Sequence, residues 1–377
     1  MLRSLAKPLR HVKGPVAPGS PARAAHPAMT WQSGGMNTSP RRPASIEDVA
    51  RQAGVSRTTV SHALNGKGRV NVETRLRVEQ AARALGYRGN AIARRLASGT
   101  RGGVLALHVA ARESPTVVWD VEYFTILISA AATAALPHGY WLTLAPVSAT
   151  EDMWNSLPTD GVIIVDPLIN DPLVRAFEDR DVPVVTVGRS SLELNGRRGW
   201  VDNDHNSGTR AMLEHLRAQG AGSIALLTGP EMNSYTLDTR HAYEGWVAEH
   251  GAEAKCYTAG SGLSEEAGYE ATAKMFAGGW RPDAIYATVD RLALGSLHAI
   301  KDHGLSVPQD ILLSSLSDSQ SARLARPPLT ALDLHPELVG RYAAEMLIAL
   351  VEGGRIQSRH RLIPAQVVPR RSTETRP

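Results

Sequence analysis

Apolar residues recur at helical spacing in the segment that begins at Ser45. Ser45 and Asp48 form a capping-type start for a short helix whose apolar residues fall on one face, Ile46, Val49, Ala50 and Ala53. Gly54 supplies a tight turn, and Ser56 then caps a second helix over residues 57–64, with two inward-facing positions, Val60 and Leu64. The spacing predicts two short helices joined at a glycine.

A third helix follows a glycine-rich break at residues 66–68. Asn71 caps this helix and Gly86 ends it, and its apolar stripe is Val78, Ala81, Ala82 and Leu85. Three short helices with a glycine at the first turn predict a helix-turn-helix module.

After Gly102 the pattern changes to short apolar strands. The expected strands are 104–109, 141–145, 161–165, 183–187, 224–228, 284–287 and 311–316. Helix-length stretches, such as 209–219 and 292–302, separate most of them. Alternation of strands and helices predicts parallel sheet with helices on both faces. Because the segment is too long for one such sheet, we expect two similar subdomains with a ligand cleft between them.

Charge is distributed unevenly along the chain. Residues 1–44 carry seven basic and no acidic residues, 45–102 carry eleven basic and four acidic ones, and 103–377 carry 23 basic and 33 acidic ones. A basic block on an acidic body is typical of a phosphate-binding module joined to another domain. The lone Cys256 excludes an intramolecular disulfide and fits a cytoplasmic protein. No apolar run is long enough for a membrane helix, so no membrane partner is expected.

A helix-turn-helix module with a surplus of basic residues indicates a DNA-binding regulator, and two other classes of protein can be weighed against it. An enzyme on a Rossmann-like sheet would need a phosphate-binding glycine loop, paired metal ligands or a nucleophile elbow, and none is present. We therefore expect no enzymatic activity, no cofactor and no metal. A secreted sugar-binding protein is compatible with the α/β segment after Gly102, but the basic helix-turn-helix segment and the lack of a signal-peptide core argue against it.

The run SIEDVARQAGVSRTTVSHALNGKGRVNVETRLRVEQAARALGYRGNAIARRLASG, residues 45–99, resembles the headpiece of the lactose-repressor (LacI/GalR) family. The body is similar to that family too, in segments that fall in family order: VDNDHNSGTRAMLEHLRAQG (201–220), IALLTGP (224–230), RPDAIYATVDRLALG (281–295), PPLTALDLHPELVG (327–340) and VVPRRST (367–373). The resemblance covers residues 45 to about 373.

The resemblance implies an α/β protein: an all-α helix-turn-helix headpiece and a periplasmic-binding-protein-like domain of two parallel-sheet α/β subdomains. We expect a disordered basic tail or an upstream start at 1–43, the headpiece at 44–89, a hinge helix and linker at 90–102, and an effector-binding and dimerisation domain at 103–377. The expected subdomains are about 103–198 with 319–351, and 199–318 with 352–370.

By resemblance, three residues of the second helix read base edges, Arg57, Thr58 and His62, and Arg57 suits a bidentate contact to guanine. His62 stands where the family usually has arginine. Five further positions match phosphate contacts of the family, Ser45, Ser56, Thr59, Ser61 and Asn65. Ser45 and Ser56 are also helix caps, so capping is an alternative to phosphate contact, and Arg57 could be a solvated surface residue.

The hinge candidate, residues 90–98, is alanine-rich and too short to be a stable helix alone. The resemblance implies that it folds on operator DNA, pairs with the hinge of a second protomer and inserts Leu96 into a minor-groove base step. Arg94 and Arg95 would lie against flanking phosphates. The alternative is that Leu96 is a small core residue under the hinge.

For the cleft, the resemblance implies that Asp290 binds hydroxyl groups of an effector, although a helix cap is an alternative role. The family commonly has Asn where Val289 stands. The other candidates are Arg240, which could instead form a surface ion pair, Trp246 in the helix after it, the family's cleft-lining aromatics Tyr123 and Phe124, and the acids Asp120, Asp166 and Asp202. Loop acids are often turn or cap residues.

The sequence thus predicts a sequence-specific transcription regulator. We expect a repressor that binds pseudo-palindromic double-stranded operator DNA as a homodimer and responds to a small-molecule effector such as a sugar. A corepressor-dependent regulator is the alternative, and a sugar-binding protein without DNA function is a further one.

Overall fold

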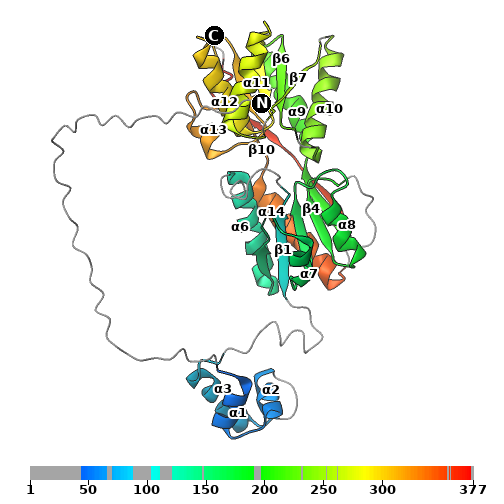
Figure 1. The fold of residues 1–377 in the computed structure, drawn as a ribbon, viewed down its shortest axis with the longest axis vertical. Coiled ribbons are helices and arrows are strands. Elements are labelled where there is room, and N and C mark those ends of the chain that lie inside the picture. Colours follow the sequence, from blue (N-terminus) through cyan, green and yellow to red (C-terminus); the bar gives the residue numbers. More distant parts are fainter. Residues whose placement is uncertain are drawn as a thin grey trace, which may run out of the picture. The chain divides into compact units, whose positions relative to one another are not determined.

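A computed structural model describes residues 44–65, 70–87, 103–110, 121–146, 148–190, 197–230, 232–251, 253–260, 262–354, 356 and 358–374. The described residues form two compact units, one within Met1–Tyr87 and the other within Arg88–Pro377 (Figure 1). The predicted tail, the predicted hinge with Arg94, Arg95 and Leu96, and the candidate Asp120 lie outside the described residues.

The first unit contains the three predicted helices, α1 (Ile46–Ala53), α2 (Arg57–Asn65) and α3 (Val72–Ala84). Ser45 and Asp48 form a reciprocal capping box, and Gly54 ends α1 in the left-handed conformation with φ of 63°. The buried core consists of small apolar residues from all three helices, Val49, Ala50, Ala53, Val60, Ala63, Val78, Ala81 and Ala82. The helix-turn-helix prediction is confirmed, including its start at Ser45.

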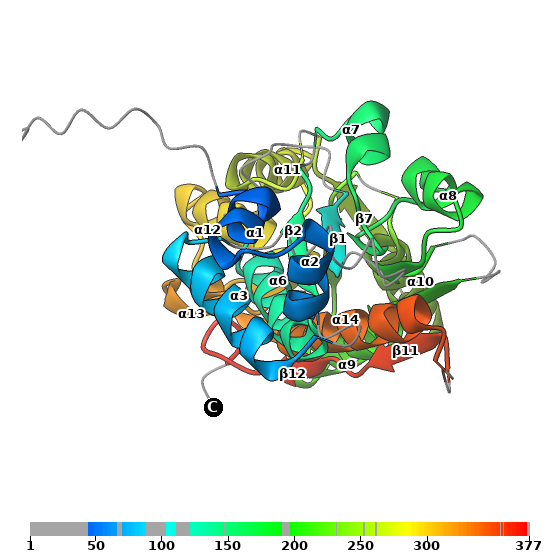
Figure 2. The ribbon, with the colours of Figure 1, turned by 90° about the horizontal axis from the view of Figure 1, so that it is seen from below.

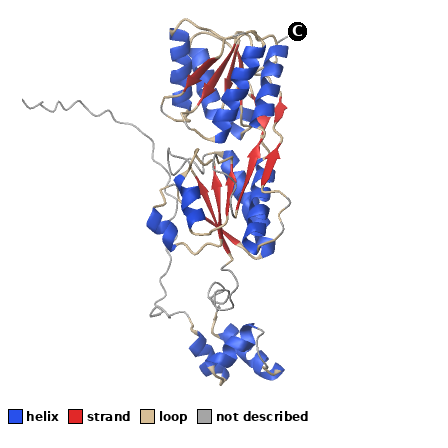
Figure 3. Cartoon of the chain, turned by 90° about the vertical axis from the view of Figure 1, so that its right-hand side faces the viewer, coloured by secondary structure: helices blue, strands red, loops and turns tan. Residues whose placement is uncertain are grey.

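The second unit contains two sheets, each covered by helices on both faces (Figure 3). In the described part of the chain the first sheet has the order β11-β5-β4-β3-β1-β2, and all its neighbouring strands are parallel. Its strands are β1 (Val104–Val109), β2 (Trp141–Leu144), β3 (Gly161–Val165), β4 (Val184–Val187), β5 (Arg198–Asn203) and β11 (His360–Ile363).

The second sheet has the order β12-β10-β9-β8-β6-β7, again for the described residues, and only β12 runs antiparallel to its neighbour. Its strands are β6 (Ile224–Thr228), β7 (Lys255–Thr258), β8 (Ala284–Ala287), β9 (Leu312–Ser315), β10 (Thr330–Asp333) and β12 (Gln366–Val368). The central strands are fully buried apolar runs, as expected of parallel strands with helices on both sides.

The helices divide between the two sheets. The first sheet is covered on one face by α6 (Glu122–Ala135), with the 3-10 turn η1 (Leu136–His138), and α14 (Pro336–Glu352), and on the other by α7 (Glu151–Ser156) and α8 (Pro172–Asp179). The second is covered by α11 (Glu265–Ala277), α12 (Asp290–Asp302) and α13 (Gln320–Leu324), and oppositely by α9 (His205–Ala218) and α10 (Ser234–Glu249).

Helices α6 and α14 lie side by side on the first sheet (Figure 2). Their backbones approach closely at Gly340, because a Cβ atom there would stand 2.2 Å from the carbonyl oxygen of Leu127. Any larger residue at this position would force the two helices apart.

The chain passes between the subdomains three times in the described residues, at positions that differ from the predicted ones. The first passage follows β5, after Asn203 rather than near 198, because β5 pairs with β4 of the first sheet. The second follows β10, after Asp333 rather than near 319, and the third follows β11, because β11 pairs with β5. The predicted subdomain boundaries were therefore wrong by about one strand each, since strands with polar residues were not recognised.

Candidate DNA-binding helix and effector cleft

Helix α2 presents its three predicted base-reading residues on the protein surface. Arg57, Thr58 and His62 are all exposed, whereas Val60 is fully buried against α1 and α3. The Arg57 guanidinium lies 3.2 Å from the Glu47 carboxylate, with 71% and 56% of the two side chains exposed. An ion pair this exposed contributes little to stability, so the guanidinium can exchange Glu47 for another acceptor.

The predicted phosphate-contacting residues are mostly occupied with local caps. The Ser45 hydroxyl donates to Asp48 at 2.8 Å. The Ser56 oxygen accepts the Thr59 amide at 3.1 Å, and the hydroxyls of Ser56 and Thr59 lie 2.9 Å apart. Ser61 is half-buried. Asn65 is the last residue of α2, and its side chain lies outside the described residues. Capping is therefore a role that the structure gives to Ser45 and Ser56.

A cleft between the two subdomains encloses about 1060 Å³ of empty space, including the open solvent at its mouth. Its lining includes five of the acidic and aromatic residues proposed from the sequence, Tyr123, Phe124, Asp166, Asp202 and Asp290. They come from both subdomains, and aliphatic side chains such as Val187 and Leu334 separate them. A mostly apolar cleft with a few converging polar groups is the usual form of a small-molecule site.

Asp290 is the first residue of α12, but it does not cap the helix. The cap position is Val289, which forms no side-chain cap hydrogen bond. The Asp290 carboxylate instead accepts a hydrogen bond from the Ser319 hydroxyl. The backbone amide of Asp290 donates to the Ser317 hydroxyl at 3.3 Å. A carboxylate in the first turn of a helix is stabilised by the helix dipole and keeps further lone pairs for a ligand.

Asp166 and Tyr123 face the cleft from the first subdomain. Asp166 has a φ of 51°, in the left-handed region that is uncommon for residues other than glycine. Burial raises the pKa of the Tyr123 phenol well above its ordinary value, and the carboxylates of Asp166 and Asp202 raise it further. Tyr123 therefore remains a hydrogen-bond donor at all physiological pH values, and its oxygen lies 3.5 Å from Asn203.

Asp202 is a buried carboxylate whose polar contacts connect several segments that border the cleft. It is 3% exposed and accepts the backbone amides of Asn203 at 2.8 Å and Arg189 at 3.1 Å. Its other neighbours are the Arg189 guanidinium and the His205 imidazole, whose Nε2 lies 3.5 Å away. With this many partners, Asp202 has mainly a structural role.

Two residues proposed for the effector site lie elsewhere. Trp246 is 4% exposed in the core between α10 and the second sheet, and its indole donates to Glu214 at 2.6 Å. Arg240 is not part of the cleft lining, and its Nη2 lies 3.4 Å from the buried Thr228 hydroxyl. Neither residue lines the cleft: Trp246 packs toward the second sheet and α9, and Arg240 contacts the last residue of β6.

The sequence did not single out several other residues of the cleft wall, His205, Asn233, Tyr235, Thr288, Arg291 and Ser317. Each lies one to seven residues after the end of a strand of one sheet or in the first turn of the following helix. In parallel α/β folds, ligands bind beyond the carboxyl ends of the strands. That rule could have identified these positions once the strands were located.

The two subdomains also touch along one rim of the cleft. The Ile169 amide donates to the Met232 carbonyl at 3.0 Å, and Arg189 of the first subdomain pairs with Asp238 of α10. Gly188 allows this approach, because a Cβ there would stand 3.1 Å from the Ser234 hydroxyl. The lobes are thus joined by polar contacts as well as by the three chain passages.

Two family models match the chain. "Bacterial regulatory proteins, lacI family" matches residues 45–90, and "Periplasmic binding protein-like domain" matches residues 213–373. These ranges contain the helix-turn-helix unit and most of the second subdomain.

Curated relatives match over most of their length. HTH-type transcriptional regulator AglR of Rhizobium meliloti is 31% identical over 73% of this chain and 78% of its own. HTH-type transcriptional repressor PurR of Erwinia tasmaniensis is 30% identical over 89% and 98%. HTH-type transcriptional regulator CelR of Thermobifida fusca is 28% identical over 83% and 93%.

Solved structures share the fold. The Lac repressor dimer bound to operator and the anti-inducer ONPF is 25% identical, covers 89% of this chain and 100% of its own, and has a TM-score of 0.77. A complex of the transcriptional regulator CelR with cellobiose is also 25% identical, covers 87% and 99%, and has a TM-score of 0.66. Among the described residues, no helix is both long and apolar enough to cross a membrane.

Proposed function

Because this chain belongs to the LacI family of bacterial regulatory proteins, we propose that it represses transcription by binding operator DNA through α2 and that a small polar effector in its cleft controls this binding. The chain is a DNA-binding transcription regulator. The observation that carries the proposal for the cleft is Asp290, a carboxylate at a helix start in a cleft walled by aromatic and aliphatic side chains.

For the DNA, Arg57, Thr58 and His62 enter the major groove and read base edges. Arg57 exchanges Glu47 for the O6 and N7 atoms of a guanine, and His62 donates to an acceptor on a neighbouring base. The hydroxyls of Ser45, Ser56, Thr59 and Ser61, with Asn65, approach the phosphates on either side. The exposure of Arg57 and His62 on one face of α2 supports this assignment.

The hinge adds a second contact. Leu96 enters a minor-groove step and kinks the duplex, while Arg94 and Arg95 neutralise flanking phosphates. The hinges of two protomers pair on a pseudo-palindromic operator, so the active form is a homodimer, as in the Lac repressor dimer bound to operator. This regulator acts on cytoplasmic DNA and catalyses no reaction.

The effector is a neutral polyhydroxylated molecule, a sugar or a related metabolite. Aromatic rings such as Tyr123, Phe124 and Tyr235 offer flat apolar faces to a sugar ring, and the carboxylates of Asp166 and Asp290 accept hydrogen bonds from its hydroxyls. The CelR–cellobiose complex is a structural neighbour with a sugar of this kind.

The test begins with a thermal-shift screen of mono- and disaccharides, cellobiose included, on the full chain. A ligand at 100 times its Kd adds about 2.7 kcal/mol to the free energy of unfolding. An operator selected from random duplexes is then titrated by fluorescence anisotropy with and without each stabilising sugar. Weaker DNA binding with a sugar supports the inducer form of the proposal, and tighter binding supports the corepressor form. Stabilisation by no sugar would contradict the effector class, and failure to select any operator would contradict the DNA function.

A further inference from the structure

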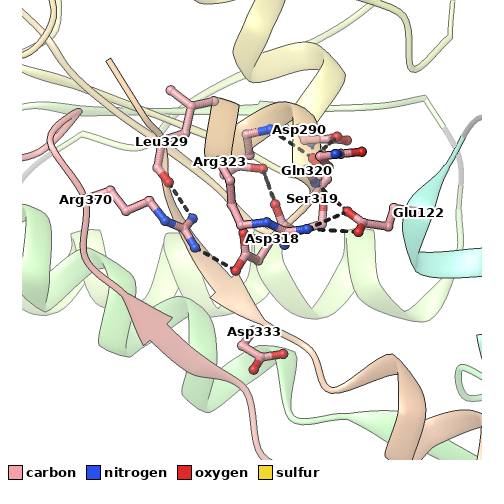
Figure 4. A network of polar contacts seen from close by, with 12 residues as sticks. Glu122, Asp290, Asp318, Ser319, Gln320, Arg323, Leu329, Asp333 and Arg370 are labelled. Carbon is pink, nitrogen blue, oxygen red and sulfur yellow. Dashed lines mark hydrogen bonds and ion pairs between the residues drawn. The ribbon is translucent and has the colours of Figure 1, made fainter. Parts of the chain in front are cut away.

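An ion-pair clasp joins the two subdomains at the edge of the cleft near α13 (Figure 4). Nη2 of Arg323, on α13 of the second subdomain, lies 2.9 and 3.1 Å from the two carboxylate oxygens of Glu122, the first residue of α6 in the first subdomain. The backbone amide of Gln320 donates a hydrogen bond to the same carboxylate. Three contacts on one carboxylate hold the start of α13 against the start of α6.

The clasp is anchored within the second subdomain. Nη1 of Arg323 lies 3.4 Å from the Asp318 carboxylate, whose other oxygen accepts from Arg370 at 2.8 Å. Arg370 in turn donates to the Leu329 carbonyl at 2.8 Å. The Asp318 and Arg370 side chains are only 15% and 17% exposed, so solvent screens this anchor less than a surface pair. The Arg323 side chain itself is 41% exposed, and its guanidinium is oriented by Asp318 on one side and Glu122 on the other.

Ser319 connects this clasp to the effector cleft. It is 8% exposed and caps α13, because its oxygen accepts the Ala322 amide at 3.1 Å. The same hydroxyl donates its proton to the Asp290 carboxylate, which lines the cleft. A hydroxyl has one proton and two lone pairs, so Ser319 uses its donor on Asp290 and an acceptor site on its own helix.

We infer that Ser319 is a positioning residue that couples the effector-facing carboxylate of Asp290 to the Glu122–Arg323 clasp between the subdomains. While Asp290 accepts from Ser319, the cap of α13 is fixed, and Gln320 and Arg323 meet Glu122. A ligand hydroxyl that draws Asp290 away from Ser319 loosens the cap and weakens the clasp, so occupancy of the cleft changes the contact between the lobes. This inference rests on the proposed effector role of Asp290.

Hydrogen exchange of the α13 amides in the full, ligand-free chain tests the coupling, with mass spectrometry of a peptide that spans residues 318–325. Asp290→Asn makes the acceptor neutral, and Glu122→Gln weakens the clasp. We expect each to speed exchange of this peptide. The double variant is expected to speed it less than the product of the single effects, by about twofold or more, as found for groups in one network.

Repeating these measurements in proteins that also carry a substitution of Ser319 tests whether the coupling depends on the Ser319 hydroxyl. With Ser319→Ala the effects of Asp290→Asn and Glu122→Gln should multiply, whereas Ser319→Thr keeps a capping hydroxyl and should keep the coupling. Asp302→Asn, which removes another α12 acid whose contact is Tyr269, is the charge control and should leave the peptide unchanged. Exchange in β8 and β9 reports that each variant is folded.

Effects that multiply in the chain with Ser319, or a coupling that survives Ser319→Ala, would overturn the inference. Because no effector is used, that outcome leaves the proposed effector site standing. Conversely, a failed sugar screen does not change the expected exchange pattern.

Discussion

The side-chain amide of Asn203 donates a 2.7 Å hydrogen bond to the backbone carbonyl of Leu334 and thereby ties together two passages of the chain between subdomains. Asn203 ends β5, and Leu334 follows β10. Both residues are buried, at 2% and 7% exposure, so neither group can turn to water. Two of the chain passages that connect the subdomains of the second unit are therefore joined to each other by a hydrogen bond.

We expect Asn203→Ala to lower the free energy of unfolding by about 1–3 kcal/mol, because the Leu334 carbonyl would remain buried without its donor. Urea unfolding followed by circular dichroism measures the difference. Asn206→Ala, at an exposed position of α9, is the matched control and should change little. Equal stability of the two variants would mean that water replaces the lost donor.

For the recognition helix, Arg57→Ala should weaken binding to the selected operator by about 1–3 kcal/mol, the scale of one bidentate base contact. It should also relax the preference at one base pair. Arg83→Ala removes the same charge from α3, where Arg83 has an acidic neighbour of its own, Glu79. Anisotropy titrations at matched salt compare the two. An equal loss in both variants, with unchanged sequence preference, would assign Arg57 to general electrostatic attraction.

Trp246 lies in the core and Tyr123 lines the cleft, so substitutions at the two positions should have different effects. Trp246→Phe removes the hydrogen bond to Glu214 and some packing, so it should lower the free energy of unfolding by about 1–3 kcal/mol and leave the effector response unchanged. Tyr123→Phe removes a hydroxyl from the cleft and should raise the sugar concentration that gives a half-maximal response. Sugar titrations of operator binding test both. A shifted midpoint for Trp246→Phe would return this residue to the effector site.

Stability should fall in mild acid, in part because of His108. Burial lowers the pKa of its imidazole, an effect larger than the opposing influence of Asp171 and nearby backbone hydrogen bonds. Below the ordinary value of about 6.5, the unfolded chain binds a proton that the folded chain resists, so the free energy of unfolding decreases as the pH falls. His108→Leu should reduce this slope between pH 7.5 and 5.5, measured by urea unfolding. Identical slopes for the two proteins would contradict this role of His108.

Elements with regular patterns could be predicted from the sequence. The three headpiece helices, with their caps at Ser45 and Asn71, and the buried apolar strands β1, β3 and β6 lie where the periodicity placed them. Here local hydrophobicity and the final environment agree, because each element buries its own apolar residues. The family resemblance then supplied the overall architecture, which the comparisons confirm.

Polar strands could not be predicted in this way. Strand β5 contains three buried polar residues, Arg198, Asp202 and Asn203. Each has a polar partner in the folded protein, which compensates for its burial. The partners are Glu178 for Arg198, Arg189 for Asp202 and the Leu334 carbonyl for Asn203. These partners are far away in the sequence. Missing β5, β10 and β11 shifted the three predicted subdomain boundaries.

Only some of the cleft-lining residues could be predicted from the sequence. Asp166 and Asp290 follow strands, and that position is visible in the sequence. The orientation of α10 is not, because it depends on which of its faces packs on the second sheet. Trp246 and Arg240 therefore appeared to be candidates, whereas Tyr235, at the start of the same helix, reaches the cleft.

The central claim, that occupancy of the cleft sets the affinity for operator DNA, is tested most directly by operator titrations of wild type and Asp290→Asn with and without the sugar that stabilises the wild-type protein. Wild type should change its operator affinity by about 5–150-fold when the sugar is added, the usual range of coupling between two sites. Asp290→Asn should still bind ligand-free operator, with an affinity that reflects its weakened Glu122–Arg323 clasp, and the sugar should change that affinity by less than about twofold. A folded Asp290→Asn protein that no longer binds operator, or that responds to the sugar as wild type does, would contradict the claim.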